Sequence, residues 1–245
     1  MLYGANPEQL PIMGLPFWYL LIADDKPANH CLDAALTLQT AYAMDGIDAV
    51  PAPAELAVPA QDGGTTLYSN PDPRIEDDLL IGHAGLWLPQ SQRFVDSTVQ
   101  QFPELRELNP TPVFLPCQHD WDDLLGHAVG AICGRTQILY RFFRLDVLDD
   151  AVTSTRRRSE ELHPGGHFRN GVNLATNFLD LLRRDPDHRA KVLKGHYPEL
   201  IRLVTLVGDD EIFGAEDDNL RIRRADGRAV LLDELAARAA IVVAG

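Results

Sequence analysis

The stretch CLDAALTLQTAYAMDG, residues 31–46, decides how the rest of the chain is interpreted. It has no proline and its only glycine comes last, so it predicts a helix that ends at Gly46. The apolar side chains that recur at helical spacing, and that predict its buried face, are Cys31, Ala35, Leu38 and Tyr42. Asn29 is a suitable N-cap, which places Cys31 in the first turn of the helix.

Cys31 is a candidate nucleophile because of this position. The start of a helix offers free backbone N–H groups and a partial positive charge, and both stabilise a thiolate relative to a thiol. A nucleophilic cysteine also needs a base that takes its proton.

A histidine for that role lies on a predicted hairpin. Two strand-like segments, residues 79–88 and 93–99, flank the turn PQSQ and predict a β-hairpin. With the turn centred between its two middle residues, His83 faces Thr98, and Asp96 lies diagonal to His83 on the same face. An aspartate in this place can orient the imidazole and stabilise it when protonated. The sequence therefore predicts a His–Asp pair that serves the cysteine.

Four short motifs carry a resemblance to a known family. They are CLDAA (residues 31–35), MDGIDA (44–49), GHAGLWL (82–88) and FVDST (94–98). Together they resemble the transglutaminase-like superfamily, in which a cysteine helix ends in a large-x-Gly-Ile-x-Ala turn and is followed by a histidine strand and an aspartate strand. The resemblance covers residues 28–100. It implies an α+β, papain-like fold, with the helix packed on an antiparallel sheet. It further implies a triad of Cys31 as nucleophile, His83 as base and Asp96 as orienting group.

The chemistry that this resemblance implies is acyl transfer through a thioester, with no organic cofactor. We expect hydrolysis of a peptide or other amide, because water is the abundant acceptor unless a site excludes it. An amine acceptor, as in a transglutaminase or N-acyltransferase, is one alternative, and a non-catalytic protein-binding module of the same fold is another. Trp18 and Trp87 are candidates for substrate contact. Trp18 or Tyr19 could support the oxyanion together with the backbone N–H of Cys31.

The segments around this core are less regular. Residues 17–22 form a continuous apolar run and predict a buried strand. Residues 48–58 contain two prolines, which confine them to an edge strand or an extended segment. Residues 59–79 are rich in glycine, proline, aspartate and asparagine and predict a long surface loop. Residues 137–148 predict a longer, partly exposed strand.

The pattern changes after residue 150, which divides the chain into a catalytic core, residues 1–150, and a mainly helical extension, residues 151–245. In the extension we predict helices at 173–184, 187–194, 198–207 and 233–240, a loop at 163–167 and a hairpin at 220–232. The apolar stripe of the first helix must be buried on the core, in a homo-oligomer or against another protein.

Composition excludes several classes of protein. The chain has 245 residues, and 36 acidic against 22 basic side chains give a formal net charge of −14. An acidic protein repels phosphate, which argues against nucleic acid and anionic lipid as partners. No apolar run approaches the ~20 residues of a membrane-spanning helix and no signal peptide is evident, so we expect a cytoplasmic protein. Its three cysteines, an odd number, fit that expectation.

A second group of residues contains potential zinc ligands, namely Cys117, His119, His127 and Cys133. Their spacing matches no zinc-finger or ribbon pattern, and the apolar residues between them predict a core helix instead. We therefore predict no metal site and keep a zinc protein as a third alternative.

Overall fold

The structure, a computed structural model, describes residues 9–22, 30–60, 63–68, 74–76, 79–106, 112–133, 136–195, 197–216, 219–232 and 234. Its α-helices are α1 (Gln9–Ile22), α2 (Cys31–Met44), α3 (Pro103–Arg106), α4 (Trp121–Leu124), α5 (Asp149–Leu162), α6 (Gly166–Arg184), α7 (Pro186–Val192) and α8 (Pro198–Val207). The strands of the first half are β1 (Val50–Pro59), β2 (Thr65–Tyr68), β3 (Arg74–Glu76), β4 (Leu79–Ile81), β5 (His83–Leu88), β6 (Arg93–Asp96), β7 (Val113–Pro116), β8 (Ala128–Cys133) and β9 (Thr136–Phe142). The strands of the C-terminal part are β10 (Glu211–Glu216), β11 (Asn219–Arg223) and β12 (Ala229–Leu231).

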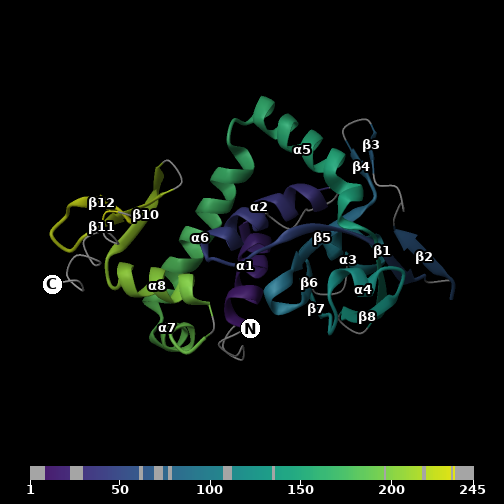
Figure 1. The fold of residues 1–245 in the computed structure, drawn as a ribbon, viewed down its shortest axis with the longest axis horizontal. Coiled ribbons are helices and arrows are strands. Elements are labelled where there is room, and N and C mark those ends of the chain that lie inside the picture. Colours follow the sequence, from purple (N-terminus) through teal and green to yellow (C-terminus); the bar gives the residue numbers. More distant parts are fainter. Residues whose placement is uncertain are drawn as a thin grey trace.

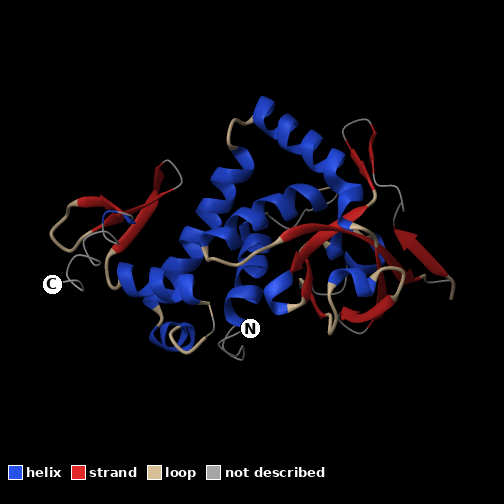
Figure 2. Ribbon diagram, in the orientation of Figure 1, coloured by secondary structure: helices blue, strands red, loops and turns tan. Residues whose placement is uncertain are grey.

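These elements form three regions along the longest axis of the molecule (Figure 1). A curled sheet lies at one end, a group of helices lies in the middle and a small sheet, β10-β11-β12, lies at the other end. Colouring by secondary structure separates the central helices from the strands on either side (Figure 2). The protein is thus a mixed α+β protein built on antiparallel pairing, as the sequence predicts.

The large sheet has the strand order β7-β6-β5-β1-β9-β8, with β2 added to β1. The two outermost strands, β7 and β8, also lie against each other, so the sheet curls toward a barrel. Its interior holds a cluster of aromatic rings, with Phe94 centred 5.1 Å from Tyr140 and 4.9 Å from Phe142. Because side chains alternate between the faces of a strand, the other face of β5 is left to pack on helices.

Helix α2 covers that outer face, and it begins at Cys31 with His30 as its N-cap, one residue later than the predicted N-cap Asn29. Leu38 and Tyr42 of α2 share one hydrophobic core with Leu86 of β5 and Val95 of β6. The helix ends at Met44, and Gly46, two residues later, has a positive φ of 71°. Side chains other than glycine rarely adopt that conformation, so the residue type fixes the end of the helix.

The same core includes the C-terminal extension. Phe178 of α6, Leu203 of α8 and Ile222 of β11 belong to it. The apolar stripe of α6 is therefore buried within this chain rather than left for a partner. At the crossing of α6 and α2, a Cβ atom at Gly171 would lie 2.5 Å from Thr40 Cβ and 2.6 Å from the Thr37 carbonyl oxygen. Only glycine permits so close an approach of the two helices.

We predict that Gly171→Ala lowers the free energy of unfolding by about 1–3 kcal/mol, the usual cost of overpacking a core. Urea denaturation followed by circular dichroism measures this. Gly130→Ala is the matched control, because a Cβ atom there would meet its first neighbour, Gln137 Nε2, only at 3.5 Å. Equal stability of the two variants would contradict the tight α2–α6 contact.

The apolar run at residues 17–22 is helical, so the prediction of a strand is wrong. It is the second half of α1, whose first half buries Leu10, Ile12 and Leu15. A short apolar run has the same pattern in a buried strand and in a buried helix. The decisive signal was the apolar character of the residues before Pro16, which extends the segment to helical length.

β1 is a central strand, although its prolines predicted an edge strand or an extended segment for residues 48–58. It pairs with β5 on one side and with β9 on the other. β9 pairs only from Ala54 onward, and the Pro53 carbonyl on that side accepts a hydrogen bond from the Phe143 N–H. Pro51 and Pro53 therefore precede the part of β1 that pairs with β9, so their missing N–H groups interrupt no pairing between these two strands.

Other segments of the first half also differ from their predicted secondary structure. Residues 59–79 contain strands β2 and β3 as well as loop, and Gly82 separates β4 from β5 within the predicted strand 79–88. The predicted core helix between residues 117 and 133 is the short α4 followed by strand β8. The predicted strand 137–148 ends at Phe142 and is followed by a short 3-10 helix.

The C-terminal elements agree more closely with their predictions. Helix α8 has the predicted bounds, and α7 lies within one or two residues of them. Strands β11 and β12 form the predicted hairpin, and β10 adds a third strand. Helix α6 begins at Gly166, inside the predicted loop 163–167. Asn29 and most of the predicted helix 233–240 lie outside the described residues.

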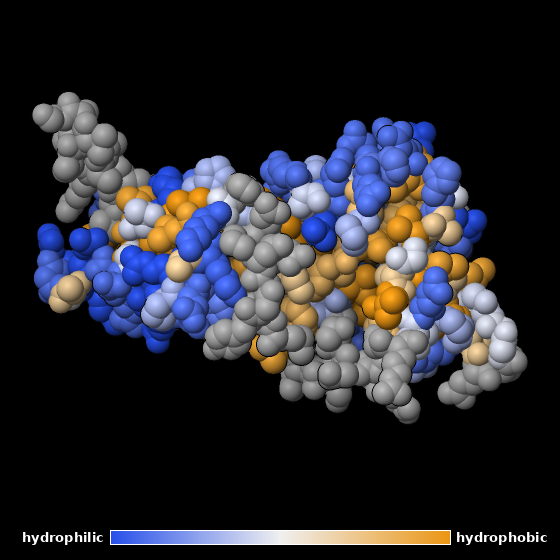
Figure 3. Space-filling view, turned by 90° about the horizontal axis from the view of Figure 1, so that it is seen from below, coloured by the Kyte–Doolittle hydropathy of each residue, from blue (hydrophilic) through white to orange (hydrophobic). Residues whose placement is uncertain are grey.

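The surface differs between the two ends of the molecule. Seen from below, polar side chains dominate the end that carries β10–β12, and apolar side chains gather toward the barrel end (Figure 3). Among the described residues, no helix has the length and apolar character needed to cross a membrane.

Candidate active site

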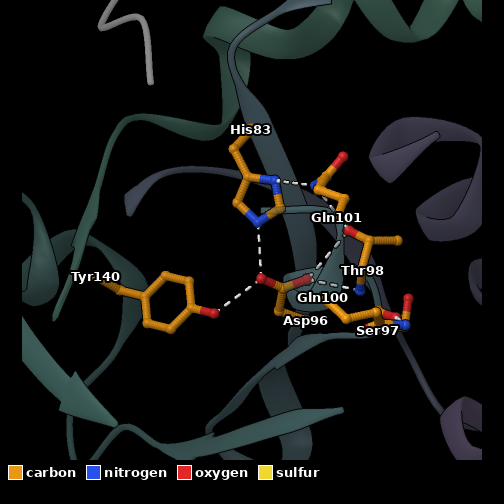
Figure 4. Close-up of polar contacts among 7 residues, drawn as sticks. All are labelled: His83, Asp96, Ser97, Thr98, Gln100, Gln101 and Tyr140. Atoms are coloured by element: carbon orange, nitrogen blue, oxygen red, sulfur yellow. Dashed lines mark hydrogen bonds and ion pairs between the residues drawn. The ribbon is translucent and has the colours of Figure 1, made fainter. Parts of the chain in front are cut away.

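The hairpin of β5 and β6 has the register that the sequence predicts. Leu86 pairs with Val95 and Trp87 with Phe94, which carries His83 and Asp96 onto the same face of the sheet. Their side chains meet there, with 2.7 Å between His83 Nε2 and Asp96 Oδ2 (Figure 4). The predicted His–Asp pair is therefore present in the structure.

Asp96 is a fully buried carboxylate with partners for both oxygens. The Tyr140 hydroxyl donates to Oδ2 at 2.8 Å, beside the His83 contact. The Thr98 N–H donates to Oδ1 at 2.8 Å, and the Thr98 hydroxyl donates at 3.2 Å. Burial alone would raise the pKa of Asp96, but the charge of His83 and these hydrogen bonds hold it below its ordinary value.

His83 is equally buried, with 2% of its surface exposed. A carboxylate only accepts hydrogen bonds, so Nε2 carries the proton that is shared with Asp96. Burial by itself lowers the pKa of His83, but Asp96, with a smaller contribution from Cys31, raises it to about 10. Imidazolium is therefore the form that this pocket favours at neutral pH.

The second ring nitrogen, Nδ1, lies 3.2 Å from Gln101 Nε2. An amide can present either its N–H or its carbonyl, so Gln101 can pair with the neutral and with the protonated ring. Gln101 also donates to Thr98 Oγ1 at 3.3 Å, which ties it to the residue that holds Asp96. The Phe102 ring covers His83 edge-on at a centroid distance of 5.0 Å.

Cys31 is the first residue of α2, and its side chain lies close enough to His83 to contribute to the raised pKa of the imidazole. It is 5% exposed and packs with Ala84 of β5, Leu148 and Ala151. His30 occupies the N-cap position, and its side chain makes no capping hydrogen bond. The structure thus joins His83 to Asp96 by a hydrogen bond and places Cys31 close enough to act on the pKa of His83.

The two aromatic residues upstream of Cys31, Trp18 and Tyr19, lie in different surroundings. Tyr19 of α1 lies close enough to Cys31 and Asp33 for their charges to act on it, and burial together with these charges raises its pKa to about 12. Trp18, its neighbour, instead lines a surface pocket with Leu181 of α6 and Pro186 of α7. Of the two candidates for oxyanion support, Tyr19 is the one whose pKa responds to the cysteine.

Trp87, the other predicted substrate contact, is 4% exposed inside the barrel. Its ring packs on Trp121 with centroids 5.4 Å apart. In this position the indole fills the core of the barrel.

Sequence reasoning missed several residues that hold the site. Tyr140 reaches Asp96 from β9, 44 residues along the chain, and no local signal links the two. Thr98 could have been found, because a threonine two residues after an aspartate is well placed to donate its N–H to that carboxylate. Gln101 follows in the same short segment and has no such signal.

Among the described residues, no group of three or more His, Cys, Asp and Glu side chains is arranged to hold a metal ion. Cys117 and Cys133 are buried in the barrel, whereas His119 and His127 are exposed. The structure therefore does not bring these four together, and all three cysteines are free thiols.

Comparisons with known proteins add little to this geometry. No protein-family model matches the sequence, and no curated protein shows significant similarity to it. A solved structure of a genomics target is 14% identical to this chain and aligns with 94% of it and with 91% of its own length, at a TM-score of 0.35. A similarity of that size carries no argument about fold or function.

Proposed function

We propose that the protein is a cysteine-dependent acyl-transfer enzyme with a transglutaminase-like, papain-like core, and that it hydrolyses amide bonds. The observation that carries the proposal is the buried hydrogen bond between His83 and Asp96, with Cys31 close enough to raise the pKa of His83. Its further support is the place of the cysteine at the first residue of a helix that packs on an antiparallel sheet.

In the first half of the proposed reaction, the site starts as a pair of Cys31 thiolate and His83 imidazolium, with the former thiol proton on Nδ1 because Nε2 is engaged by Asp96. The thiolate sulfur forms a bond to the carbonyl carbon of the substrate, and the carbonyl electron pair moves to oxygen. The C–N bond then breaks, the leaving nitrogen takes the proton from His83, and an acyl thioester remains on Cys31.

The negative oxygen of the tetrahedral intermediate needs hydrogen-bond donors. The backbone N–H of Cys31 supplies one, because the first N–H groups of a helix have no partner within it. The Tyr19 hydroxyl supplies the second in this proposal, since its high pKa keeps it protonated at neutral pH.

In the second half, water attacks the thioester while His83 accepts its proton. The C–S bond breaks, the thiolate leaves, and the product is a carboxylic acid. An amine acceptor would follow the same steps and give a new amide. The net charge of −14 favours cationic or neutral substrates over anionic ones.

A non-catalytic module that binds a protein partner is the second candidate, and one observation favours it. Cys31 is 5% and His83 2% exposed, which is the burial expected of small core side chains. The two candidates differ in the reactivity that they require of Cys31.

We predict that iodoacetamide labels Cys31 selectively below pH 7, with Cys117 and Cys133 far slower. Burial raises the pKa of Cys117 to about 11, which leaves a thiolate fraction of about one in ten thousand at pH 7. Burial and the charge of Asp96 also raise the pKa of Cys133. Mass spectrometry at each cysteine over a pH series measures the three rates.

Labelling in denaturant serves as the control, because unfolding removes the environment of each thiol and should make the three rates similar. Equal, slow labelling of the three cysteines in the folded protein would contradict the enzyme and support the binding module.

A further inference from the structure

A second group of titratable side chains lies beside the proposed nucleophile. Asp33, two residues after Cys31, pairs through Oδ1 with His167 Nε2 at 2.7 Å and through Oδ2 with His30 Nδ1 at 3.2 Å. The charges of Asp33 and of Cys31 both raise the pKa of Tyr19. Burial alone would raise the pKa of Asp33, but the two histidines hold it below its ordinary value, so it is a carboxylate at neutral pH.

The two histidines come from different parts of the fold. His30 belongs to the N-cap of α2 and is more than half exposed. His167 belongs to the first turn of α6, in the C-terminal extension, and its side chain is only 15% exposed. The contact of His167 with Asp33 therefore ties the extension to the helix turn that carries the cysteine.

The first turn of α2 needs a stabilising contact from outside the helix. Cys31 is the first residue of α2, where helices fray, and His30 makes no side-chain capping bond.

Helix α6 is well placed to supply this stabilising contact. Gly171 lies one helical turn after His167, on the same side of α6, and it is the point where α6 meets the backbone of α2 at Thr37. Two successive turns of α6 thus engage α2, one through close packing and one through the His167–Asp33 pair.

We propose that helix α6 sets the reactivity of Cys31, with His167 as the positioning residue that holds the first turn of α2 through Asp33. This inference rests on the proposed function, because it concerns the reactivity of the same thiol. The His167–Asp33 hydrogen bond keeps the sulfur of Cys31 near His83, so a change in the position of α6 changes the position of the nucleophile.

The test compares two substitutions of one residue. His167→Ala should slow the alkylation of Cys31 by about tenfold, the factor that corresponds to about 1.4 kcal/mol. His167→Gln restores an N–H donor near the position of Nε2 and should recover most of the rate. His163→Ala, an exposed histidine just before α6, is the control and should leave the rate unchanged.

A double-mutant cycle completes the design. In an Asp33→Ala background, His167→Ala should have no further effect on the rate, because the pair is already broken. Thermal unfolding of each variant shows whether a slower rate follows from lost stability. Failure of His167→Gln to recover the rate, or additive effects in the cycle, would overturn the proposal.

These outcomes are separable from a failure of the proposed function. If Cys31 in the parent protein labels no faster than Cys117 and Cys133, the nucleophile itself is refuted. If Cys31 labels selectively and His167→Ala labels equally fast, the nucleophile stands and the role of α6 is refuted.

Discussion

Replacing His83 with alanine is expected to slow the alkylation of Cys31 by about a hundredfold at pH 7, the low end of what a positioned base contributes. In the parent protein the ring can take the thiol proton, and the imidazolium then stabilises the thiolate. The raised pKa of His83, due mainly to Asp96 against the opposing effect of burial, favours that charged form. Alanine removes both the proton acceptor and the positive charge from this buried site. The rate of iodoacetamide labelling, followed by mass spectrometry, measures the change.

A matched control is available in another buried histidine. His188 of α7 is 4% exposed and pairs with Asp185 Oδ2 at 3.2 Å, outside the candidate site. His188→Ala should lower stability without changing the labelling rate of Cys31. An unchanged rate in His83→Ala would remove the base from the proposed triad, and an equal loss in both variants would trace the effect to the fold rather than to the site.

The parts of the site that could be predicted from sequence are those with local causes. The turn PQSQ sets the register of β5 and β6, and register places His83 beside Asp96. Gly46 marks the end of α2, so its length and the position of Cys31 follow from the chain itself. Neither inference needs knowledge of a distant segment.

The parts that could not be predicted depend on contacts between distant segments. Residues 17–22 have the same apolar pattern in a strand as in a helix, and the core in which their helix packs against α6 is not visible in the local sequence. Pro51 and Pro53 predicted an edge strand. β1 is a central strand all the same, because β9 pairs with it only from Ala54 onward. Tyr140 donates a hydrogen bond to Asp96 from 44 residues along the chain. His167 pairs with Asp33 from 134 residues along the chain.

Replacing Asp96 with alanine is expected to lower the free energy of unfolding by about 3–5 kcal/mol, the usual cost of removing one partner of a buried ion pair. The variant leaves the His83 ring, the Tyr140 hydroxyl and the Thr98 N–H without their acceptor inside the barrel. Urea denaturation at pH 7 measures the loss. Asp96→Asn keeps the shape and one acceptor oxygen, so it should lose less.

The contribution of this pair should also depend on pH, in a direction that its two pKa shifts fix. The pKa of His83 is raised from 6.5 to about 10, so the stability that it provides is complete below pH 6.5 and is lost as pH rises through about 10. The pKa of Asp96 is lowered from 3.8, so its contribution is present above pH 3.8 and is lost as pH falls below it. The difference in unfolding free energy between the parent and Asp96→Asn should therefore be largest between about pH 4 and 6.5 and shrink toward pH 10. A difference that stays constant over this range would mean that His83 and Asp96 share a neutral hydrogen bond. In that case the site would lack the stored positive charge on which the proposed activation of Cys31 depends.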